Sequence, residues 1–104
     1  MPIVSIYCVF ADEAEAERIG RTVVEERLAA CINILAPCRS LYRWQGRIEE
    51  DAEVPAILKA DAAVAERLVE RLAELHSYEV PAITVWPVEK AHPPYAEWVR
   101  QNAG

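Results

Sequence analysis

The sequence predicts an α+β fold in which the elements follow the order β-α-β-β-α-β, with one more helix at the C-terminus. Three observations predict it. A β-branched and aromatic run opens the chain, two segments with apolar residues at helical spacing follow, and a long β-rich stretch with a glycine-containing turn lies between them. This is the order of the split β-α-β, or ferredoxin-like, arrangement, in which both helices cover one face of the sheet and the first strand is central.

The first strand is expected in IVSIYCVF, residues 3–10. One face of this run is entirely apolar and the other nearly so, which is typical of a strand covered on both sides. Asp12 then offers an N-cap, with Glu13 and Glu15 in the first helical turn. Apolar residues recur at helical spacing to about Leu28, so an amphipathic helix is expected there.

Two long antiparallel strands are expected over residues 30–60, joined by a tight turn at Gln45 and Gly46, where the glycine supplies the positive φ that such a turn needs. Their combined length exceeds the usual strand of about 5–6 residues several-fold, so part of this hairpin should project beyond the sheet. Pro37 and Pro55 fall inside it. Because proline cannot donate to a central ladder, each is expected at a bulge or an unpaired edge position.

A second helix is expected after Asp61, which can cap it, and it should run to about Leu75. The run AITVWPV, residues 82–88, predicts a fourth strand, and HPPYAEWVRQN, residues 92–102, predicts a last helix whose start tolerates proline. The sheet face opposite the two crossing helices is left without cover. With the projecting hairpin, that face is expected to be closed by other copies of the chain in a homo-oligomer.

The composition indicates one globular domain that covers residues 1–104. The chain is 53% hydrophobic and has only three glycines, which argues against a disordered chain. Its formal net charge of -6 argues against a nucleic-acid partner, because phosphate recognition depends on Lys and Arg. The apolar opening run lacks the basic flank of a signal peptide and the length of a membrane span, so we expect a cytoplasmic protein without a membrane partner.

The three cysteines are Cys8, Cys31 and Cys38, an odd number that predicts no disulfide framework in a reducing compartment. Cys31 and Cys38 are seven positions apart on one expected strand, which separates them by roughly 23 Å at about 3.3 Å per residue. They are therefore too far apart to share a metal ion or to form a disulfide. Each cysteine can be a small buried apolar residue or a single soft ligand.

The most polar cluster is expected at HSYEV, where His76, Tyr78 and Glu79 follow the second helix. His76 could take a functional role there or cap the last carbonyls of that helix. An acidic run at residues 49–53 is expected at a solvated edge, because carboxylates on a strand alternate between its faces. The chain has no Gly-x-Ser-x-Gly, no Walker-type glycine loop and no C-x-x-C pair, so no enzymatic activity is expected.

Four segments resemble, in order and spacing, the signature segments of the CutA family of divalent-cation tolerance proteins: EERLAACINIL, SLYRWQGRIEED, ELHSYEVPAI and YAEWV. The likeness extends from about Ile3 to Val99. It implies a ferredoxin-like protomer in a tight homotrimer, similar in architecture to PII-type signalling proteins, with the long hairpins joining the subunits. It also implies tolerance of copper and other divalent metals and a capacity to bind copper, with no organic cofactor.

The resemblance further implies a set of metal ligands. The family's proposed ligands match Cys8, at the end of the first strand, and His76; Cys31, in LAACIN, is an alternative soft ligand. Where some members have two adjacent histidines, this chain has Leu75 before His76, and Ser77 replaces the usual proline after it. Thiolate and imidazole ligands suit copper or zinc rather than magnesium or calcium.

A complete ligand set would need further side chains or a neighbouring subunit, and clefts between subunits are natural places for it. On the resemblance, Lys59, Tyr78 and Glu79 are expected near such a cleft. The function expected first is a non-enzymatic homotrimer that binds divalent metal, copper above all. The alternative is a PII-like sensor whose inter-subunit cleft binds a small anionic effector or a partner protein. An enzyme on this scaffold is the third possibility, for which no catalytic constellation is visible.

Overall fold

The computed structural model describes residues 2–104. Its elements follow the predicted order with one strand more than expected: β1 (Ile3–Phe10), α1 (Glu13–Glu25), β2 (Cys31–Ile34), β3 (Cys38–Trp44), β4 (Arg47–Asp61), α2 (Ala65–Leu75), β5 (Ile83–Pro87) and α3 (Pro93–Asn102). The sheet is antiparallel with the order β2-β4-β1-β5, and β3 pairs with β4 outside this row. The first strand is therefore central, as predicted.

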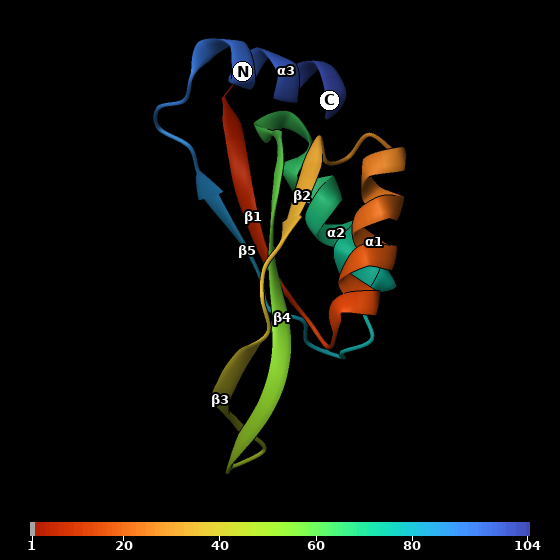
Figure 1. The fold of residues 1–104 in the computed structure, drawn as a ribbon, viewed down its shortest axis with the longest axis vertical. Coiled ribbons are helices and arrows are strands. Elements are labelled where there is room, and N and C mark those ends of the chain that lie inside the picture. The colour runs from red at the N-terminus through yellow and green to blue at the C-terminus, as the bar shows by residue number, and fades with distance from the viewer. Residues whose placement is uncertain (1) are drawn as a thin grey trace.

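Helices α1 and α2 lie on the same side of the sheet (Figure 1). Ile6, Cys8 and Phe10 of β1 belong to the core and are wholly buried, whereas Ser5 and Tyr7 are only partly buried. Gly20 of α1 lies against Ile32 of β2, where an added Cβ would come within 2.7 Å of the Ile32 Cδ1 atom. Glycine at this position therefore lets the helix approach the sheet closely.

The long hairpin is present, but only one of its two strands is continuous. β4 runs for 15 residues, whereas the opposite strand is broken into β2 and β3 at residues 35–37, which include Pro37. The Pro55 carbonyl accepts a hydrogen bond from the Leu35 N–H at 3.0 Å. Since N–H and C=O of one residue point the same way in an antiparallel strand, the missing N–H of Pro55 also faces this break. Both prolines thus lie where the ladder is open, as predicted.

Beyond the break, β3 and residues 47–53 of β4 pair with each other and project from the rest of the molecule (Figure 1). We call residues 38–53 the β3–β4 arm. Its turn consists of Gln45 and Gly46, which have φ values of 50° and 78°, and positive φ at both positions is typical of a two-residue hairpin turn. The arm contributes to a molecule 44 Å long and only 25 by 23 Å across.

Two helix boundaries differ from the sequence-based expectation. α1 ends at Glu25 rather than near Leu28, and Arg27 follows with a positive φ of 63°. Asp61 caps a short 3-10 turn at Ala62–Val64, whose Ala63 N–H it accepts at 2.9 Å, and α2 begins only after that turn. Capping signals in the sequence do not distinguish a 3-10 turn from the start of an α-helix, because both leave the same N–H groups free.

The sheet face opposite α1 and α2 is less open than predicted, because α3 covers one end of it (Figure 1). The Tyr95 hydroxyl of α3 lies 3.6 Å from the Cys31 sulfur on this face, and Val99 of α3 is wholly buried. Farther along the same face, Tyr7 and Trp86 stack with ring centroids 5.3 Å apart, and Trp86 remains 48% exposed. None of the helices within residues 2–104 is long and apolar enough to cross a membrane.

Candidate functional site

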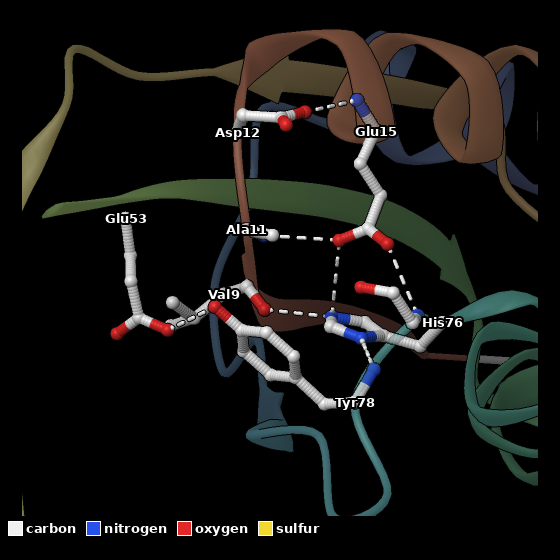
Figure 2. Close-up of polar contacts among 8 residues, drawn as sticks. Val9, Ala11, Asp12, Glu15, Glu53, His76 and Tyr78 are labelled. Carbon is white, nitrogen blue, oxygen red and sulfur yellow. Dashed lines mark hydrogen bonds and ion pairs between the residues drawn. The ribbon is translucent and has the colours of Figure 1, made fainter. Parts of the chain in front are cut away.

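His76 caps the C-terminal end of α2, and its side chain is buried. Figure 2 shows that both ring nitrogens are engaged: Nδ1 accepts the Tyr78 backbone N–H at 3.0 Å, and Nε2 lies 2.8 Å from the Val9 carbonyl oxygen. Because Nδ1 is an acceptor, the hydrogen-bond pattern assigns the proton to Nε2, which donates to Val9. The ring therefore has no free lone pair for a metal ion in this arrangement.

Two aromatic rings hold the His76 imidazole in place. The Phe10 ring stacks on it with centroids 5.3 Å apart, and the Tyr78 ring packs at 4.8 Å with a tilt of 50°. Phe10 ends β1, whereas Tyr78 follows α2, so the histidine joins two segments that are far apart in the sequence. This packing favours a structural role for the ring.

Glu15 is the carboxylate closest to this histidine. It lies in the first turn of α1, is 4% exposed, and accepts the backbone N–H groups of Ala11 at 2.9 Å and Ser77 at 3.0 Å (Figure 2). Its Oε1 atom is 3.9 Å from His76 Nε2. Burial opposes the ionisation of Glu15, but the hydrogen bonds from Ser77 and Ala11 outweigh it and lower its pKa. An ionised carboxylate thus ties the start of α1 to the end of α2.

Cys8, the second predicted ligand, is wholly buried in the core. Burial, followed by the nearby charge of Glu15, raises the pKa of its thiol to about 12. The thiol is therefore protonated at neutral pH, whereas a metal binds the thiolate. A metal could reach Cys8 only if this end of the core opened.

Cys31, the third predicted ligand, is more accessible. It lies half-buried on β2, an edge strand of the sheet, beside the Tyr95 hydroxyl. Burial and then the contact with Cys31 raise the pKa of Tyr95 to about 12. Lys59 is the cross-strand partner of Cys31 and is half-buried, and its ammonium group makes no hydrogen bond or ion pair with the residues that the structure describes. Cys31 and Lys59 thus lie side by side on the face that α3 partly covers.

Within residues 2–104, no group of three or more His, Cys, Asp or Glu side chains is arranged to hold a metal ion. The structure thus does not assemble the predicted ligands into one site within a single chain. All three cysteines are free, and Cys38 lies on a different strand from Cys31, with its sulfur 3.7 Å from the Ser40 hydroxyl.

A cavity of about 480 Å³ lies between the β3–β4 arm and the segment that follows His76. Tyr78 and Glu79, two of the three residues expected near a cleft, line it, whereas Lys59 does not. The remaining lining residues are Val9, Ser40, Tyr42, Trp44, Asp51, Glu53, Val80 and Ala82.

Two tyrosine–carboxylate hydrogen bonds shape this cavity. The Tyr78 hydroxyl donates to Glu53 Oε2 at 2.7 Å (Figure 2), and the Tyr42 hydroxyl donates to Asp51. Burial and the bond to Glu53 raise the pKa of Tyr78, and the bond to Asp51 raises the pKa of Tyr42 to about 12. Both hydroxyls therefore stay protonated and continue to donate at neutral pH.

The contribution of the β3–β4 arm to this cavity was not predicted from the sequence, although the alternation of side chains along its strands indicates which residues share a face. Side chains alternate along a strand, so residues 40, 42 and 44 of β3 share a face, and the register places residues 51 and 53 of β4 on that face as well. Their convergence with Tyr78 depends on how the chain after α2 turns back toward the arm, which no local pattern predicts.

Comparison with known proteins gives consistent results. The family described as "CutA1 divalent ion tolerance protein" matches residues 4–102. The divalent-cation tolerance protein CutA of Pyrococcus horikoshii is 43% identical over 97 residues, which are 93% of this chain and 94% of that protein. The mouse protein CutA is 43% identical over 90 residues, or 86% of this chain, but the match spans only about half (51%) of the mouse protein. The crystal structure of CutA from Xylella fastidiosa superposes with a TM-score of 0.96 and 34% identity over 100% of both chains.

Proposed function

Since the chain belongs to the CutA1 divalent ion tolerance family, we propose that it confers tolerance of divalent cations, copper above all, by binding the metal in a cytoplasmic homotrimer without catalysis. The observation that carries this proposal is the family match over residues 4–102, together with relatives named divalent-cation tolerance proteins that align along most of their length.

Features of the surface support association of the chain with other copies, as the proposed homotrimer requires. Leu41 and Ile48 of the β3–β4 arm are each 62% exposed, and Trp86 on the partly open sheet face is 48% exposed. Such exposed apolar side chains are typical of surfaces that another protein covers. We expect light scattering to report a mass three times that of the 11.7 kDa chain. A monomer would contradict this part of the proposal.

Among the three predicted ligands, we carry Cys31 forward as the metal-binding sulfur. Its thiol is half-exposed at the edge of the sheet, whereas Cys8 is enclosed in the core and both nitrogens of His76 are hydrogen-bonded. A thiolate ligand suits copper(I). The other ligands would come from a neighbouring copy, because the described residues of one chain form no cluster of three metal-binding side chains.

Copper(I) titration in competition with a chelator of known affinity tests this assignment. We expect Cys31→Ser to weaken copper binding, and Cys38→Ser to leave it unchanged as a control with a thiol of similar exposure. Cys8→Ser and His76→Ala are expected to keep the copper affinity of the wild type if they remain folded. Loss of copper binding in those two variants, with Cys31→Ser unaffected, would place the metal at Cys8 and His76 instead.

A further inference from the structure

The cavity beside the β3–β4 arm carries a chemistry that the proposed metal site does not use. Three of its lining residues are acidic, namely Asp51, Glu53 and Glu79, and no Lys, Arg or His is among the residues that line it. The chain as a whole has a formal net charge of -6. A concave site lined by one sign of charge concentrates the field, so the potential in this cavity is negative.

Aromatic rings form much of the remaining wall. Tyr42 and Trp44 come from β3 and are 38% and 40% exposed, and Tyr78 comes from the segment after α2. The face of an aromatic ring attracts a cation through its quadrupole, and tryptophan does so most strongly. The aromatic rings and the carboxylates of this cavity therefore both favour a cationic ligand.

Glu53 offers a free acceptor to a ligand in the cavity. This residue is 7% exposed, and its Oε2 atom accepts the Tyr78 hydroxyl at 2.7 Å. Among the residues that the structure describes, no donor is bonded to its other oxygen. Among the described residues no buried side-chain oxygen lacks a partner, so this second oxygen is accessible to solvent and free to accept an N–H donor of a bound cation.

The two tyrosine hydroxyls orient the acids for such a ligand. Tyr78 holds Glu53 and Tyr42 holds Asp51, each through a single hydrogen bond. A carboxylate has two oxygens with about four acceptor sites, so each acid keeps capacity for a further donor. The hydroxyls remain donors at neutral pH, because the ordinary tyrosine pKa of about 10 already lies above it and both pKa values are raised further.

We propose that this cavity binds a small organic cation, a guanidinium or primary ammonium compound, whose N–H groups bond to Glu53 and Asp51 while its body packs against Trp44 and Tyr42. The volume of about 480 Å³ lies in the usual range of small-molecule sites, about 300–1,000 Å³. A small anionic effector, the kind expected for a PII-like sensor, would meet three carboxylates and no cation. The proposal depends on the residues of one chain and not on metal binding.

Calorimetric titration with agmatine, which carries a guanidinium and a primary ammonium group, tests the proposal in buffer that contains a metal chelator. We expect wild-type protein to bind agmatine, and not 4-guanidinobutyrate, in which a carboxylate replaces the ammonium group. Glu53→Gln should weaken binding about tenfold or more, because a charge-assisted hydrogen bond is lost. Trp44→Leu, on the exposed arm, should weaken it several-fold without reaching the core.

Glu49→Gln is the matched control. Glu49 has the same charge as Glu53, lies on the same strand and shares its face of that strand, but it does not line the cavity. It should leave the affinity within about twofold of the wild type, because a carboxylate outside the cavity makes no hydrogen bond to the ligand. Absence of agmatine binding in the wild type, or equal losses in Glu49→Gln and Glu53→Gln, would overturn the proposal. If the wild type binds no agmatine and Glu53→Gln also has a smaller oligomeric mass than the wild type, a cationic side chain of another copy fills the cavity. That result would also overturn the proposal.

Discussion

The end of the molecule around His76 and the β3–β4 arm differ in where their side chains find partners. Around His76, the imidazole and the Glu15 carboxylate form hydrogen bonds with four backbone groups from two segments, residues 9–11 and 77–78, and both side chains are buried. On the arm, Leu41 and Ile48 lie exposed, and the Arg39–Glu50 ion pair is open to solvent. Folding provides the hydrogen-bond partners of the first region, whereas the side chains of the arm remain available to a binding partner.

This contrast indicates a structural role for the residues around His76 and a binding role for those of the arm. A buried histidine with both nitrogens bonded contributes to the free energy of unfolding and is poorly placed to exchange ligands. Aromatic, apolar and acidic side chains on a two-stranded projection contribute little to the fold but provide contact surface. Variants in both regions test this division, and their expected effects on protomer stability range from about 3 kcal/mol to less than about 0.5 kcal/mol.

We expect His76→Ala to lower the free energy of unfolding by about 3 kcal/mol, because it removes the stack on Phe10 and leaves the Val9 carbonyl and the Tyr78 N–H without their partner. Chemical denaturation at a fixed protein concentration measures the change. His92→Ala is the control, since His92 is exposed and makes no side-chain cap bond, and it should change the value by less than about 0.5 kcal/mol. Similar small changes in both variants would refute the structural role of His76.

We expect Glu15→Gln to cost about 1–2 kcal/mol at pH 7, because an amide oxygen replaces a carboxylate that accepts two backbone N–H groups. The pKa of Glu15 is lowered in the folded protein, so its contribution is fully present above the usual value near 4.3 and is lost as the pH falls through the lowered value. The stability curves of wild type and variant should therefore converge in acid.

Denaturation measured between pH 7 and pH 3 tests this convergence. Glu17→Gln is a matched control on the same helix, because Glu17 pairs with Arg21 in a largely exposed ion pair. That control should differ from the wild type by less than about 0.5 kcal/mol at every pH. Parallel curves for Glu15→Gln and the wild type would contradict the assigned role of the carboxylate.

We expect the double variant Leu41→Ser and Ile48→Ser to change protomer stability by less than about 0.5 kcal/mol, because both side chains are 62% exposed. If the arm joins copies of the chain, the same variant should have a smaller mass by light scattering and unchanged far-UV circular dichroism. Ile48→Leu keeps the apolar surface and serves as the control. A mass equal to that of the wild type would exclude this face of the arm from the interface.

Several features of the fold could be predicted because they depend on neighbours in the sequence. Asp12 caps α1 through the Glu15 N–H at 2.8 Å, Gln45 and Gly46 make the tight turn, and β1 is largely buried, as expected for a strand covered on both sides. Pro37 marks the break between β2 and β3, although its effect was larger than a bulge. In each case a few consecutive residues carry the signal.

The sequence by itself thus determined the order of the elements, the buried face of the first strand and the long hairpin, because period, capping and turn chemistry act over a few residues. Only the tertiary structure decided what the functional candidates can do. It enclosed Cys8 and bonded both nitrogens of His76, left Cys31 at an edge, and brought Tyr78 to Glu53 across 25 positions of the chain. Burial and hydrogen-bond partners depend on which distant segments pack together, and the spacing of residue types does not contain that information.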